Sequence, residues 1–200
     1  SFGVWDLNTG KRLLNVPVAD EYNKVRYITL SKDKNFALLL QGSRLYYYNI
    51  ATGQLLSTSP ELKRTEETGT FSADPGSFGA SAASSDLSLY AFSRADQDIR
   101  NKGELFVYKR SGELVYRINA HSDHIRSILF SPDDKIIYTV SYDHSIKMWD
   151  TKTGKLIGTL YLFKDSNDFV FIDPDGRFDG SEQGVKRLYF ILNREPLPLD

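Results

Sequence analysis

Histidines supply the first candidate chemistry in this sequence. His121 and His124 flank Asp123 in the tetrapeptide His-Ser-Asp-His, a spacing that suggests a metal site, and His144 is the third histidine of the chain. A zinc site requires three or four converging ligands. We therefore predict no metal ion and no cofactor.

Acidic pairs are the other candidates for catalysis. Glu66-Glu67 and the pair Asp96 and Asp98 lie in polar stretches, without apolar neighbours that would raise a carboxyl pKa. The sequence has no cysteine, which excludes a thiolate nucleophile and disulfides. Gly176 is not followed by the Lys-Ser/Thr step of a phosphate-binding loop. We predict no catalytic residues.

Composition favours one globular domain. The 200 residues are 40% hydrophobic and 26% charged, which excludes a disordered chain. The net charge is −1, so no overall field attracts nucleic acid or an acidic membrane. No apolar run approaches the ~20 residues of a membrane helix. We therefore expect a soluble chain that binds neither nucleic acid nor membrane, and its compartment stays unknown.

The elements that position these residues repeat along the chain. A short motif that ends in glycine occurs four times, with a basic spacing near 42 residues. A second motif, such as Phe130-Ser131-Pro132-Asp133, alternates with it. Runs of β-branched and aromatic residues lie between these turn phrases. The pattern predicts an all-β chain of four-stranded antiparallel units. The repeated glycines are Gly10, Gly53, Gly112 and Gly154.

These units resemble the blades of the WD-repeat β-propeller family, which have four strands and about 40 to 45 residues each. The unit from His121 to Asp150 carries the resemblance best, with Ala-His before its first strand and Trp-Asp at the end of its third. The resemblance implies a hydrogen-bonded structural tetrad inside this blade. Its four positions are His121, Thr139, Asp143 and Trp149.

The predicted propeller segment covers residues 1–192 and contains about four blades. The expected parts are a half blade at 1–16, full blades at 24–59, 76–118 and 124–162, a last blade at 167–192 and a linker-like tail at 193–200. The segment from Phe169 to Ser181 resembles the last blade of bacterial WD-repeat proteins that can precede a caspase-like peptidase domain. Any such peptidase would be a separate domain.

Ring closure has three alternatives. The chain begins with Ser inside a predicted strand, so we expect part of a larger ring with blades missing. Two alternatives remain: a small four-bladed ring, or a homo-oligomer in which two copies associate.

Long loops suggest where a partner binds. The connections around residues 60–76 and 95–103 are 12 and 5 residues longer than their counterparts, and both emerge on one face because successive strands reverse direction. We predict a non-catalytic scaffold that binds a protein or peptide there and regulates an adjacent domain. The alternative is a propeller enzyme or ligand sensor acting on a small molecule in the central channel. The candidate partner-binding residues are Arg64, Glu66, Glu67, Phe71, Phe78, Asp96, Asp98 and Arg100.

Overall fold

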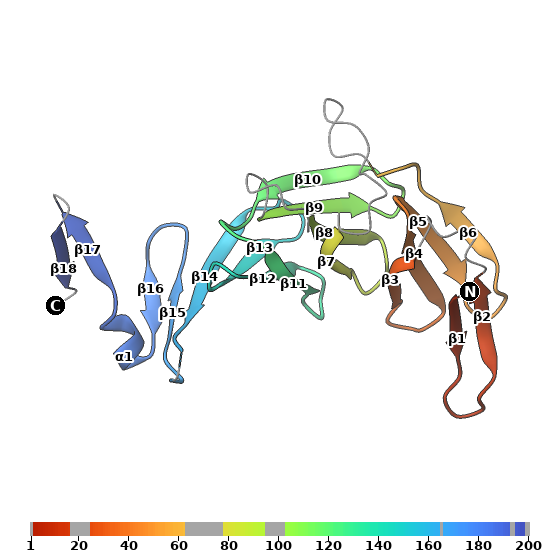
Figure 1. Cartoon of the computed structure of the whole chain (residues 1–200), viewed down its shortest axis with the longest axis horizontal. Coiled ribbons are helices and arrows are strands. Elements are labelled where there is room, and N and C mark those ends of the chain that lie inside the picture. The colour runs from red at the N-terminus through yellow and green to blue at the C-terminus, as the bar shows by residue number, and fades with distance from the viewer. Residues whose placement is uncertain are drawn as a thin grey trace.

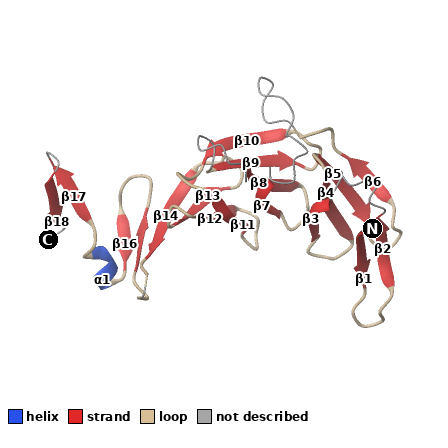
Figure 2. Cartoon of the chain, in the orientation of Figure 1, coloured by secondary structure: helices blue, strands red, loops and turns tan. Residues whose placement is uncertain are grey.

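The computed structural model describes residues 2–16, 25–62, 78–94, 103–164, 166–192 and 195–198. Within these residues the chain is almost entirely β, and the single-turn helix α1 (Glu182–Val185) is the exception (Figure 2). No helix in this described part has the length and apolar character needed to cross a membrane. The all-β class predicted from the sequence is confirmed.

Two four-stranded antiparallel sheets and one six-stranded antiparallel sheet form the body of the chain. The strands of the first sheet are β3 (Val25–Leu30), β4 (Phe36–Gln41), β5 (Arg44–Asn49) and β6 (Leu55–Thr58). Those of the second are β7 (Phe78–Ala83), β8 (Leu89–Arg94), β9 (Glu104–Lys109) and β10 (Leu114–Asn119). The third sheet contains β11 (Ile125–Phe130), β12 (Ile136–Ser141), β13 (Ser145–Asp150) and β14 (Leu156–Leu162). Each sheet is a meander in which every strand pairs with the next in sequence, as the repeat predicts.

Two hairpins lie at the ends of the described chain. β1 (Phe2–Trp5) pairs with β2 (Arg12–Val16), and β17 (Tyr189–Leu192) pairs with β18 (Glu195–Pro198). The sequence predicts a linker-like tail over 193–200, whereas residues 195–198 here form β18. The prolines of β18 fit a two-stranded edge, where alternate backbone N–H groups need no partner strand.

The segment 167–192 also differs from the separate last blade that the sequence predicts. β15 (Phe169–Ile172) pairs with β14, and β16 (Phe178–Gly180) pairs with β15, so both strands extend the third sheet. Gly158 of β14 leaves room for the Phe171 ring of β15, because a Cβ atom there would lie 2.1 Å from Cζ of Phe171.

The sheets lie side by side along an open arc (Figure 1). β3, β7 and β11 occupy the concave side, and β6 and β10 the convex side. The first strand of the second sheet contacts the first strands of both neighbouring sheets. The N- and C-terminal ends lie at opposite ends of the arc, so the described chain does not close on itself in this structure.

The second sheet is buried on both faces. Side chains of β9 alternate between two core clusters: Leu105 and Val107 pack toward the third sheet, and Phe106 and Tyr108 pack toward the first. All four are at most 1% exposed. This explains why runs of the sequence are apolar at every position. Stacked sheets of this kind form a rigid platform.

A repeated turn fixes the start of the second strand in each sheet. Ser131 Oγ donates to Asp133 Oδ1 at 2.7 Å and accepts from the backbone N–H of Ile136 at 3.0 Å. Asp134, inside this turn, adopts a φ of 57°, in the left-handed region that aspartate tolerates. The corresponding serine–aspartate bonds join Ser31 to Asp33 and Ser84 to Asp86.

Candidate functional site

The structure brings the four tetrad side chains together at the edge of the third sheet. Thr139 lies on β12 and Trp149 on β13. Trp149 pairs with Ile137, two residues before Thr139, so both side chains point to the same face. His121 precedes β11, and Asp143 lies in the turn between β12 and β13. Two stretches of chain, one before β11 and one that runs from β12 through the turn to β13, therefore meet at this point.

A continuous hydrogen-bond chain joins the four side chains. The Trp149 indole Nε1–H donates to Thr139 Oγ1 at 2.8 Å, and that hydroxyl lies 2.7 Å from His121 Nε2. His121 Nδ1 lies 2.9 Å from Asp143 Oδ2. An ionised Asp143 can only accept, so Nδ1 carries the proton and Nε2 accepts from the Thr139 hydroxyl. Every polar atom of the chain then has a partner.

Burial and hydrogen bonds determine the charges in this cluster. Burial lowers the pKa of His121 and outweighs the opposing effect of the Asp143 carboxylate. Burial would raise the pKa of Asp143, but hydrogen bonds from Ser145 and His121 dominate and hold it at about 2. Asp143 also accepts from the backbone N–H of Ser122 at 3.1 Å. At neutral pH the pair is a neutral imidazole and a carboxylate.

This geometry is suited to fixing structure. The arrangement superficially matches a hydroxyl–imidazole–carboxylate triad, in which the hydroxyl attacks a substrate. Here the hydroxyl belongs to Thr139, which is 0% exposed and accepts the indole N–H of Trp149, itself 6% exposed. A substrate carbonyl has no access to that oxygen. The cluster instead connects the segment before β11 to β12 and β13.

The remaining histidines make local contacts. The backbone N–H of His124 donates to Asp123 Oδ1 at 2.7 Å. His144 has a φ of 65° in the turn between β12 and β13. Within the described ranges, no group of three or more His, Asp or Glu side chains is placed to hold a metal ion.

Most of the candidate partner-binding residues lie outside the described residues. These are Arg64, Glu66, Glu67, Phe71, Asp96, Asp98 and Arg100. Phe78 is the first residue of β7 and pairs with Arg94 through the backbone. The segments that flank both long connections are described, and they belong to the first and second sheets.

Sequence reasoning missed the polar contacts between sheets. The backbone N–H of Ser85 donates to both carboxylate oxygens of Asp134, at 2.9 and 3.0 Å, and Ser85 Oγ donates at 2.5 Å. The Arg110 guanidinium lies over the ring of Tyr47 in the first sheet, 3.9 Å from its centroid. Both pairs bridge neighbouring sheets. The recurring serine–aspartate phrase signals a turn, but not a partner 49 residues away.

A family profile described as "WD domain, G-beta repeat" matches residues 112–150. This range contains β10 through β13 and all four tetrad residues. Residues 112–150 are thus similar to a WD repeat. The four-stranded antiparallel sheets of the structure agree with WD-repeat propeller blades.

Curated relatives match the chain over short stretches. "Ribosome assembly protein 4" of Saccharomyces cerevisiae is 38% identical over 50 residues, which cover 25% of this chain and 10% of the relative. "Protein LST8 homolog" of Dictyostelium discoideum is 40% identical over 57 residues, or 26% of this chain and 19% of the relative. A WD repeat-containing protein of Synechocystis is 35% identical over 68 residues, which cover 34% of this chain and 20% of the relative. The chain thus spans at most a fifth of the length of these three relatives.

Proposed function

We propose that this WD-repeat chain is a non-catalytic scaffold that holds a protein or peptide partner. The observation that carries the proposal is the stacking of sheets whose central member is buried on both faces. Such a stack resists deformation and presents its loops and turns in fixed positions. The similarity to WD-repeat proteins supports the same role, since proteins of this kind generally bind other proteins.

The two long connections between strands favour the face on which they emerge as the surface that binds a partner. The chain between β6 and β7 and the chain between β8 and β9 leave the sheets at the same face, because strands alternate in direction. Loops on a rigid scaffold commonly carry recognition residues. Phe71 and Arg100, one in each long connection, are the anchors that we propose for a partner.

The test compares captured partners quantitatively. The tagged chain and its Phe71→Ala/Arg100→Ala variant are used to capture proteins from the source cells, followed by mass spectrometry. We expect the double variant to lose specific partners while its thermal unfolding is unchanged. Arg177→Ala, which changes one arginine in the turn between β15 and β16, is the control and should retain them. Equal partner sets for all three chains would refute the long-loop surface.

We also propose that the scaffold regulates an adjacent domain. The support is the resemblance of Phe169–Ser181 to the last blade of bacterial WD-repeat proteins that precede a caspase-like peptidase. The coding sequence downstream of residue 200 tests this directly. A domain with a His–Cys dyad there would support the proposal, and a stop codon or an unrelated domain would contradict it.

A further inference from the structure

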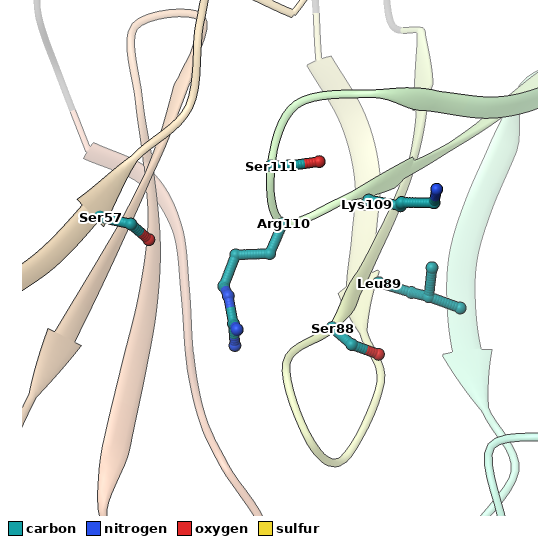
Figure 3. A pocket seen from close by; sticks show the side chains of 6 residues that line it. All are labelled: Ser57, Ser88, Leu89, Lys109, Arg110 and Ser111. Atoms are coloured by element: carbon teal, nitrogen blue, oxygen red, sulfur yellow. The ribbon is translucent and has the colours of Figure 1, made fainter.

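Two adjoining hollows lie on the face opposite the long loops. This face carries the turns β7–β8 and β9–β10, since alternate turns of a meander emerge on opposite sides. The first hollow, of about 520 Å³, lies at the seam between the first and second sheets (Figure 3). It is lined by Ser57, Ser88, Leu89, Lys109, Arg110 and Ser111.

The second hollow has about 450 Å³ and follows the next seam, between the second and third sheets. Leu89 and Lys109 line both hollows, so the two hollows adjoin each other. We call the pair the seam groove. The second hollow is also lined by Val115, Asp134, Lys135, Asp150, Thr151 and Lys152.

Arg110 is a fixed cation in the seam groove. Its backbone N–H donates to the Ser88 carbonyl at 2.8 Å, and its guanidinium lies over the Tyr47 ring. Figure 3 shows its side chain extending into the space between Ser57 and Ser88. Stacking engages the flat face of a guanidinium and leaves its in-plane N–H donors available. Among the residues that the structure describes, no carboxylate forms an ion pair with Arg110.

Three of the neighbouring charged side chains are already engaged. Lys109 Nζ is paired with both carboxylate oxygens of Glu113, at 2.8 and 2.9 Å. Asp134 accepts from Ser85, and Asp150 accepts from Thr153 in its own turn. Arg110 is therefore the cation of the first hollow with capacity for an external anion.

Serine hydroxyls and aliphatic groups complete the surface. Ser57, Ser88 and Ser111 also line the first hollow, and the Ser88 hydroxyl is hydrogen-bonded to Asp86. Leu89 and Val115 give the second hollow an apolar floor. The first hollow thus offers a cation and the second an apolar surface. A ligand that fits both carries an anionic group and, farther along, an aliphatic group.

We propose that the seam groove binds an extended acidic peptide segment. A Glu or Asp side chain of the peptide forms charge-assisted hydrogen bonds with Arg110, and a following aliphatic side chain packs on Leu89 and Val115. The proposal rests on the scaffold function, and it adds a second recognition surface opposite the long loops.

Defined peptides provide the probe. The ¹⁵N-labelled chain is titrated with blocked decapeptides of Gly and Ser that carry one Glu and one Leu, separated by one, two or three residues. Matched peptides carry Gln in place of Glu. We expect at least one Glu peptide to shift the amide signals of Ser88, Lys109 and Arg110 saturably. Its Gln counterpart should bind about tenfold more weakly, since the charge-assisted bonds are lost.

Variants assign the effect to Arg110. Arg110→Gln should remove the preference for Glu over Gln, whereas Arg177→Gln, which removes a guanidinium outside the groove, should keep it. Thermal unfolding of each variant checks its fold.

Three results would overturn the proposal: no saturable shifts with any Glu peptide, equal affinity for the Gln peptides, or full binding by Arg110→Gln. Shifts confined to the segments that flank the long loops would also reject the groove. The scaffold function is judged separately by the capture experiment with Phe71 and Arg100. If the double variant loses its partners in the capture experiment and no peptide binds in the titration, only the seam groove is rejected.

Discussion

Asp134 of the third sheet holds the backbone N–H and the hydroxyl of Ser85 in the second sheet, across 49 residues of sequence. The carboxylate lies in a turn whose left-handed φ of 57° directs it across the seam. Two donors converge on one charged group, and charge-assisted bonds are stronger than neutral ones. The contact links two turns of neighbouring sheets on the face that carries the seam groove.

Loss of this carboxylate should loosen the seam. Asp134→Gly keeps the backbone freedom that a positive φ requires, so it isolates the hydrogen bonds. We expect it to lower the free energy of unfolding by about 1–2 kcal/mol. Asp134→Ala should cost about 1 kcal/mol more, because alanine is strained at this φ. Urea unfolding measures both, and an Asp134→Gly chain as stable as the parent would show that the contact contributes nothing.

Trp149 supplies both packing and the terminal donor of the tetrad. Trp149→Ala should destabilise the chain by about 3–5 kcal/mol, because a large buried side chain is removed. Trp149→Phe keeps most of the volume but removes the indole N–H, with an expected loss of about 1–2 kcal/mol.

Trp5, which is 52% exposed, is the matched control for these variants. Trp5→Ala should change the melting temperature much less than Trp149→Ala. A loss below about 1 kcal/mol for Trp149→Ala would contradict a structural role for the tetrad.

The tetrad should make stability depend on pH. Hydrogen bonds from Ser145 and His121 hold the pKa of Asp143 at about 2 in the fold, against 3.8 for an ordinary aspartate. The carboxylate therefore contributes stability that is fully present above about pH 4 and is lost as the pH falls through 2. Burial lowers the pKa of His121, so protonation of the unfolded chain below pH 6.5 also favours unfolding.

Asp143→Asn removes the titrating carboxylate, and with it the group that opposes the lowering of the His121 pKa. The stability difference between the parent and Asp143→Asn should shrink from pH 4 to pH 2, where the Asp143 carboxylate of the folded parent takes up its proton. Chemical unfolding at several pH values measures it. A difference that stays constant down to pH 2 would show that the carboxylate is not favoured by the fold.

Local chemistry explains which parts of this fold the sequence predicts. The Ser131–Asp133 turn is formed by residues two apart, and the four-stranded meander follows from such turns between apolar runs. The tetrad positions came from resemblance to a repeat family, and the structure places their side chains within hydrogen-bond distance.

Pairing at sheet edges is harder to predict. β15 extends the third sheet with the Phe171 ring against Gly158, and a single glycine in a strand run does not predict that pairing. The Ser85–Asp134 contact is hidden for a similar reason, since the same residue types form local turns in every repeat. The seam groove arises from the juxtaposition of two sheets, and no single segment of sequence encodes it.

Gly103 lies where the second sheet meets the tetrad, and its substitution tests that junction. Its carbonyl accepts from the backbone N–H groups of Ala120 and His121, and an added Cβ would lie 1.8 Å from the His121 carbonyl oxygen. Backbone atoms cannot rotate away as a side chain can, so Gly103→Ala must displace either β9 or the segment that carries His121. We expect a loss of about 3 kcal/mol.

Gly53→Ala is the matched control for Gly103→Ala, because nothing lies within 4 Å of its added Cβ and only its φ of +70° opposes the change. It should cost about 1 kcal/mol. The His121 ring signals in NMR spectra provide a second measurement: they should shift in the Gly103→Ala chain and stay unchanged in Gly53→Ala. Equal stability losses with unshifted His121 signals would show that the close approach of Gly103 does not position the tetrad.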